Sequence, residues 1–135
     1  MISFNYEIDF ELKNSEEVKS WISKVILEEK CNEGDINYIF CSDEYLHKIN
    51  VKFLNHDTLT DIISFDYSIG KELHGDIYIS VDRVTENASD YGINFIDELD
   101  RVIIHGILHY CGYKDKTNDD ELLMRSKEDY YLSIR

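Results

Sequence analysis

Proline is absent from this sequence of 135 residues, and basic side chains are scarce beside acidic ones. The 14 lysines and arginines stand against 28 aspartates and glutamates, which gives a formal net charge of −14. A phosphate backbone favours a basic stripe on its partner, so this charge argues against generic nucleic-acid binding. Most of the carboxylates are expected to form a solvated acidic surface. The charge remains compatible with an RNA substrate held by a local basic patch and a metal.

The sequence also lacks the features of membrane and secreted proteins. No apolar run approaches the roughly 20 residues that a membrane span needs. The first residues, MISFNYEIDFE, are acidic and lack the basic start of a signal peptide. The 3 cysteines include no CxxC pair, which is typical of reduced thiols rather than of a disulfide framework. We therefore expect a cytoplasmic protein without a membrane partner.

One domain covering residues 1–135 is expected, because the length suits a single core and no repeat, linker or low-complexity tract interrupts the chain. Without proline, turns are marked by glycine, asparagine and aspartate alone. The order of elements, βαβαββααα, predicts an α+β fold in which about five helices cover a small four-stranded mixed sheet, with the last two strands forming a hairpin. The expected strands are 2–8, 35–41, 61–67 and 76–80, and the expected helices are 15–29, 42–51, 82–91, 95–111 and 117–133.

Local patterns predict the caps and the buried faces of these helices. Ser42 is expected to cap the second helix, and either Thr117 or Asn118 the last. Asn94, with Asp97 three residues later, resembles a capping box. The residues expected to face inward are Val18, Trp21, Ile22, Val25 and Ile26 in the first helix and Leu122, Leu123 and Tyr130 in the last.

The segment VIIHGILHYCGYKDK, residues 102–116, carries the pattern of a metal site. Its first half is apolar almost all round, which indicates a buried helix. His105 and His109 are four residues apart and therefore lie on one side of that helix. Two adjacent buried imidazoles need partners and repel if both are charged, and a divalent metal meets both demands. Gly112 is expected to end the helix, so that Asp115 can reach the same ion and leave one position open for water, as in a catalytic site.

Spacing alone is a weak signal, because a histidine pair on a helix also occurs as two satisfied core histidines. Cys111 follows His109 by two residues, about 200° around a helix, so its thiol is excluded from the site. The other histidines, His47, His56 and His74, have no helical partner and are expected at the surface or hydrogen-bonded within the fold.

Gly106 follows the first histidine at the position where H-E-x-x-H zinc proteases carry a glutamate general base. Glycine cannot take a proton, so this zincin-like metal helix is not expected to belong to a protease. Asp61, at the start of the expected strand 61–67, is a candidate proton acceptor, although it is also a plausible strand-opening residue. Ser64 in the same strand either hydrogen-bonds the site or belongs to the sheet.

Three blocks of the chain resemble the YbeY family of metal-dependent endoribonucleases. Residues 105–115, H-G-I-L-H-Y-C-G-Y-K-D, are similar to the family pattern H-G-x-L-H-x-x-G-Y-D-H. Residues 50–65, N-V-K-F-L-N-H-D-T-L-T-D-I-I-S-F, resemble N-x-x-Y-R-x-x-D-x-P-T-D-V-L-S-F, and residues 75–80, G-D-I-Y-I-S, resemble G-D-I-x-I-S. The blocks follow the family order and cover most of residues 50–115.

This resemblance implies a hydrolase that cleaves single-stranded RNA with a metal-activated water. It also implies action in maturation of the small-subunit (16S) ribosomal RNA and in ribosome quality control. Ribosomal RNA and ribosomal small-subunit proteins would then be the partners, and DNA would not. The residues by themselves lead to a metallohydrolase, and the ribonuclease activity is implied by the family alone.

The chain departs from the family pattern at two functional positions. Asp115 stands where the family has the third zinc-binding histidine, and Lys114 replaces the preceding family aspartate. An oxygen ligand widens the choice of metal, so zinc is expected first and manganese or iron(II) are alternatives. Leu54 stands where the family has an arginine implied to contact RNA phosphate. Lys114 and Lys116, on either side of Asp115, are expected to replace that charge.

Two other functions fit the residues. A site of two histidines and one carboxylate also occurs in iron(II) oxygenases, although here the ligands all fall within residues 105–115. With the family arginine and histidine both replaced, the chain also fits a non-catalytic, ribosome-associated binding module whose metal is structural.

Overall fold

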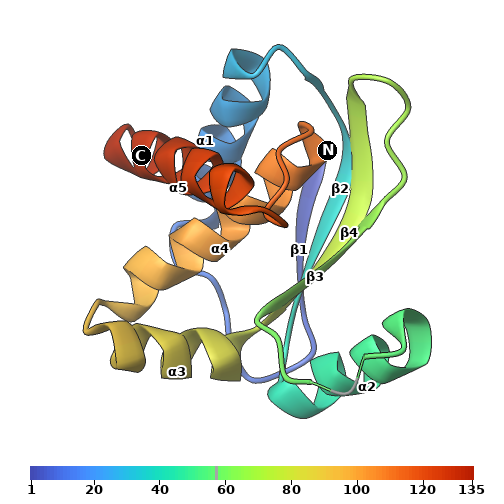
Figure 1. Cartoon of the computed structure of the whole chain (residues 1–135), viewed down its shortest axis with the longest axis vertical. Coiled ribbons are helices and arrows are strands. Elements are labelled where there is room, and N and C mark those ends of the chain that lie inside the picture. The colour runs from blue at the N-terminus through green and yellow to red at the C-terminus, as the bar shows by residue number, and fades with distance from the viewer. Residues whose placement is uncertain (57) are drawn as a thin grey trace.

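The computed structural model describes residues 1–56 and 58–135, so Asp57 of the second block lies outside the described residues. Its centre is one mixed sheet with the strand order β1-β2-β4-β3 (Figure 1). β1 (Ile2–Tyr6), β2 (Asn32–Cys41) and β4 (Glu72–Ser80) are parallel, and β3 (Ile62–Asp66) runs antiparallel to β4. The expected hairpin is therefore confirmed, and β3 is an edge strand.

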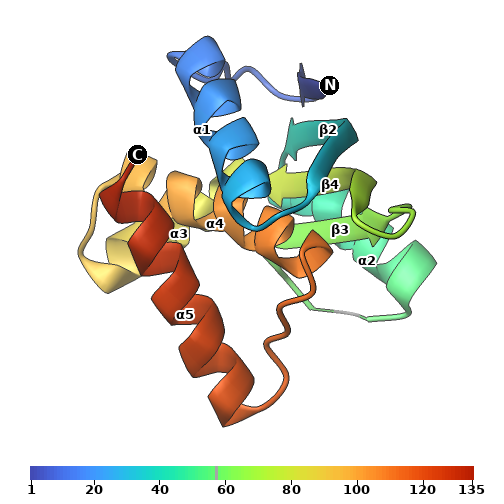
Figure 2. The ribbon, with the colours of Figure 1, turned by 90° about the horizontal axis from the view of Figure 1, so that it is seen from above.

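Helices cover both faces of this sheet (Figures 1 and 2). α1 (Ser15–Glu28), α3 (Val81–Tyr91) and α4 (Phe95–Tyr110) share one core with the sheet, and α5 (Asn118–Ser133) packs on the outside of α4. α2 (Asp43–Leu54) covers the opposite face through a smaller cluster that includes Leu46 and Ile63. The described residues thus form the predicted α+β fold, with four strands and five helices. None of these helices combines the length and apolar character needed to cross a lipid bilayer.

α4 is the central helix, buried on most of its circumference as its composition predicted. It lies close to the sheet at Gly106, where an added Cβ would meet Ile77 Cδ1 at 3.1 Å and Ile62 Cδ1 at 3.2 Å. Position 106 therefore faces β3 and β4. A glutamate placed there would point into the core, which gives a structural reason beside the chemical one why this helix has no protease-type base.

The predicted elements are all present, and the largest difference is at β4, which begins at Glu72 rather than at residue 76. The extension pairs with β2, which also begins earlier than expected, across a register shift between Glu33 and Ile36. Such a long-range ladder is not revealed by local sequence pattern. Ser42 and Thr117 cap their helices as predicted, accepting hydrogen bonds from the amides of the third residue after each. The expected capping box at Asn94 is wrong, because its side chain makes no cap hydrogen bond.

The buried face of α1 is confirmed, whereas the predicted buried face of α5 is wrong. The exposed fractions are 69% for Leu122, 50% for Leu123 and 46% for Tyr130. α5 instead buries Met124, Glu128 and Tyr131. A buried carboxylate is tolerated here because it meets charged partners on α4, described below. The first turns of α5 also diverge from the rest of the molecule, which leaves their leucines uncovered (Figure 2).

Candidate metal centre

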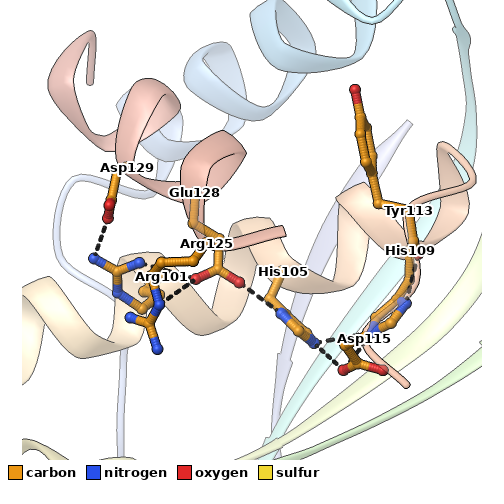
Figure 3. Close-up of polar contacts among 8 residues, drawn as sticks. All are labelled: Arg101, His105, His109, Tyr113, Asp115, Arg125, Glu128 and Asp129. Carbon is orange, nitrogen blue, oxygen red and sulfur yellow. Dashed lines mark hydrogen bonds and ion pairs between the residues drawn. The ribbon is translucent and has the colours of Figure 1, made fainter. Parts of the chain in front are cut away.

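The last turns of α4 and the loop after it bring together His105, His109 and Asp115 (Figure 3). The two Nε2 atoms are 2.9 Å apart, and Asp115 Oδ2 is 3.2 Å from each of them. Both histidines are half-buried, and Asp115 is the exposed member. The three potential ligand atoms thus form a small, nearly equilateral triangle, as the sequence predicted from the spacing of the two histidines and the position of Gly112.

The other ring nitrogens determine what this triangle can hold. His105 Nδ1 lies 2.7 Å from Glu128 Oε2, and His109 Nδ1 lies 3.0 Å from the carbonyl oxygen of Tyr113. Each Nδ1 therefore faces an acceptor and carries a proton, so that a neutral ring presents its Nε2 lone pair to the triangle. Two lone pairs and a carboxylate oxygen that point at one another repel unless a cation lies among them. The donor set fits a divalent metal of the zinc class.

A proton competes with that metal at His105. Burial by itself lowers the pKa of this imidazole, but the hydrogen bond to Glu128 and the charges of Glu128 and Asp115 raise it more, so the net pKa is above its usual value. Protonation of His105 is therefore favoured over that of an ordinary imidazole. Metal binding is consequently expected to release a proton and to weaken as the pH falls.

Gly112 provides the chain reversal that completes the triangle. It has a φ of 104°, and its amide donates to the His109 carbonyl at 3.0 Å, while the amide of Tyr113 donates to the Leu108 carbonyl at 3.0 Å. This pair of hydrogen bonds is a Schellman motif. It places the Tyr113 carbonyl under His109, and the Tyr113 hydroxyl is in turn anchored on Glu29 Oε1 at 2.7 Å. Tyr113 therefore fixes the loop that carries Asp115 through both its backbone and its side chain.

Glu128 contacts the site but was not predicted from the sequence. Its Oε2 contacts His105 and its Oε1 accepts from Arg101 Nη1 at 2.9 Å, while Arg101 Nη2 donates to Asp129 Oδ1 at 2.8 Å (Figure 3). Burial raises the pKa of Glu128, but the hydrogen bonds from His105 and Arg101 lower it more, so the carboxylate stays ionised. It can hold the His105 ring in the orientation and tautomer that a metal needs. The sequence indicated it only by placing a charged residue at position 128, on the same face of α5 as Met124 and Tyr131.

A cleft of about 740 Å³ extends from His105 and Asp115 between α4, α5 and the start of β3. Asp61 lines it, as expected of a proton acceptor near the site. Burial raises the pKa of Asp61, the charge of His105 and backbone amides lower it, and the net shift is upward. The carboxylate of Glu98 also lines the cleft and was not anticipated.

The other predicted site residues are not among the described residues that line this cleft. Ser64 sits on β3, two residues from Ile62 and so on the face toward α4, but it does not line the cleft. Lys114 and Lys116 are exposed and form no ion pair within the described residues. His56 is exposed, and His74 Nδ1 accepts from the amide of Asp35 at 3.0 Å, which agrees with their assignment to the surface and to local hydrogen bonds.

Comparison with known proteins identifies relatives over nearly the whole chain. A family model described as "Endoribonuclease YbeY" matches residues 3–134. Relatives named endoribonuclease YbeY include one from Flavobacterium psychrophilum, 65% identical over 99% of this chain and 96% of the relative. Another, from Flavobacterium johnsoniae, is 64% identical with the same coverage of each chain. A solution structure of a Thermotoga maritima protein is similar with a TM-score of 0.69 and 29% identity, over 98% of this chain and 87% of that one.

Proposed function

Because this chain belongs to the YbeY endoribonuclease family, we propose that it cleaves single-stranded RNA internally, using one divalent metal, zinc in the first instance. The observation that carries this proposal is the triangle of two Nε2 atoms and one carboxylate oxygen at the mouth of a cleft. A structural metal is normally enclosed by protein ligands, whereas a catalytic one keeps an open side. The exposure of Asp115 at the cleft therefore favours the nuclease over the ribosome-associated module with a structural metal.

In this mechanism His105, His109 and Asp115 would hold the metal, which when bound would supply an activated water at neutral pH and offset negative charge on the scissile phosphate. Asp61 accepts the proton of the attacking water, and its raised pKa makes it a better base near neutral pH than an ordinary carboxylate. Ser64, on the α4 side of β3 but not among the described residues that line the cleft, is the proposed hydrogen-bonding partner of the site.

The proposed substrate is ribosomal RNA of the small subunit, at the step that matures the 16S end, with the ribosome or its small-subunit proteins as partners. The cytoplasm is the proposed location. Three cysteines without a disulfide support it, because thiols stay reduced in that compartment.

Metal removal tests this function. Purified protein is expected to cut a labelled single-stranded ribosomal RNA fragment at internal positions, to lose that cleavage in a chelator, and to regain it with stoichiometric Zn²⁺. The same fragment annealed to its complement is the control for single-strand preference. Metal analysis of the purified protein also separates this site from an iron(II) oxygenase, which would contain iron and consume oxygen. Cleavage that persists after complete metal removal would contradict the proposal.

Lys114 and Lys116 are proposed to contact RNA phosphates beside Asp115. Replacing both by alanine removes two exposed positive charges from the loop and is expected to weaken RNA binding several-fold at low salt. The slope of log affinity against log salt concentration should fall by about 0.7 for each lost phosphate contact to single-stranded RNA. Unchanged cleavage and an unchanged salt slope in the double variant would remove both residues from the substrate site.

A further inference from the structure

We propose that the α5 side of the cleft binds the nucleotide next to the scissile one, with Arg125 holding its phosphate. This assignment rests on the proposed ribonuclease function and deepens it. Lys114 and Lys116 are proposed above to replace the charge that is missing at Leu54. Arg125 is different, because it supplies a cation inside the cleft, which Leu54 at the end of α2 does not line among the described residues.

The cleft is acidic apart from two arginines. Its described lining includes five carboxylates and two guanidinium groups; the charged residues are Asp61, Glu98, Asp115, Glu121, Glu128, Arg101 and Arg125. A phosphodiester entering this space is repelled by the carboxylates and needs a local cation in addition to the metal. Among the described residues that line the cleft, the two arginines are therefore the groups that can supply this cation.

Arg101 and Arg125 differ in how free they are to bind a substrate. Arg101 is only 20% exposed, and its two terminal nitrogens are bonded to Glu128 and Asp129 at 2.9 Å and 2.8 Å. Arg125 is 60% exposed, and its one ion pair among the described residues joins Nε to Glu128 Oε1 at 4.0 Å, too far for a hydrogen bond. The terminal nitrogens of Arg125 thus keep their donors available, in the planar arrangement that suits a phosphate.

The position of Arg125 sets which phosphate it can reach. The Glu128 carboxylate lies between His105 on one side and the two arginines on the other (Figure 3). The Glu128 carboxylate and the His105 ring thus lie between the guanidinium of Arg125 and the metal triangle. Arg125 is close enough to contact a neighbouring phosphate and is not placed on the reacting one.

Exposed apolar side chains near Arg125 provide a surface for the base. Leu122 is three residues before Arg125 on α5, so the two lie on the same side of the helix, and both line the cleft. Tyr91, at the end of α3, is 64% exposed and lines the same cleft. Aromatic faces stack on any base, which fits recognition of single strands without sequence preference. In this proposal the exposed side chain of Leu122 packs against the base.

The test compares Arg125→Gln with Lys48→Gln in the zinc-loaded protein. Lys48 is an exposed cation on α2, and its substitution gives the same change in net charge away from the cleft. Binding of a fluorescently labelled single-stranded RNA oligonucleotide is measured by anisotropy, and cleavage is measured on the same oligonucleotide. Arg125→Gln is expected to raise both Kd and KM about tenfold with kcat within a factor of two, and to lower the salt slope by about 0.7. Lys48→Gln is expected to match the wild type, and Arg125→Lys to recover most of the binding.

Three results separate the possible explanations. Equal RNA affinity of Arg125→Gln and the wild type would overturn the proposal. Loss of zinc from Arg125→Gln would also overturn it, because Arg125 would then act through Glu128 and His105 rather than on RNA. A wild type that binds RNA through Arg125 but never cuts it would reject the proposed nuclease function while supporting the nucleotide subsite.

Discussion

His109→Ala is expected to lose its stoichiometric metal and with it RNA cleavage, by a factor of about 10³ or more. The reason is geometric: two ligand atoms would remain at the triangle, and His109 is one of the pair fixed at a distance of 2.9 Å. Bound metal should be quantified in the same preparations that are assayed on a single-stranded ribosomal RNA fragment. The substitution lies at a half-buried position in the last turn of α4, so thermal unfolding should confirm that the variant is folded.

His56→Ala is the matched control, because it removes an imidazole from an exposed position outside the site. It should keep both metal and activity. If wild type and His109→Ala showed the same feeble cleavage while only the wild type contained metal, the cleavage would come from a contaminant. The ribosome-associated module with a structural metal would then be the better explanation.

Glu128→Ala is expected to affect both metal affinity and stability. Without this carboxylate, His105 loses the partner of its Nδ1, and loss of such a partner typically weakens metal binding about 10–100-fold. The substitution also removes the buried partner of Arg101, which is 20% exposed. Because Arg101 stays paired with Asp129, the expected loss of stability is smaller than the roughly 3–5 kcal/mol of a buried charge left unpaired. Urea unfolding in the presence of chelator measures the stability effect alone, and competition with a zinc indicator measures the affinity.

Asp129→Ala is the control for this prediction. Asp129 is the other carboxylate on Arg101, but it is 58% exposed, so its removal is expected to cost less than about 1 kcal/mol and to leave metal affinity unchanged. Glu128→Gln keeps the shape and one acceptor for His105, and it should fall between the wild type and Glu128→Ala. Equal metal affinity for wild type and Glu128→Ala would show that the orientation of His105 does not depend on α5.

The metal triangle could be predicted from the sequence because its determinants are local. A spacing of four residues places His105 and His109 on one side of any helix, and Gly112 signals the turn that returns Asp115. The buried face of α1 followed from the same periodicity. These inferences need no knowledge of which distant segments meet.

Glu128, Arg101 and Arg125 could not be predicted because their roles depend on how α5 is rotated about its own axis. Hydrophobic periodicity favoured the leucines at 122 and 123, and the fold instead buries the stripe that carries Glu128. That choice is made by partners far away in sequence: His105 and Arg101 for the carboxylate, and Trp21 Nε1, which donates to the Tyr131 carbonyl at 3.0 Å. A single polar residue on an otherwise buried stripe was the available signal.

The place of Glu128 in the last described helix has a consequence for the timing of activity. A growing chain is made from its N-terminus, so the sheet and both histidines of the triangle are synthesised before residue 128. Until α5 has emerged and docked, His105 lacks the carboxylate that orients it, and the cleft lacks the wall that carries Arg125. A chain synthesised only as far as α4 is therefore expected to be inactive, because it lacks both the carboxylate that orients His105 and this wall of the cleft.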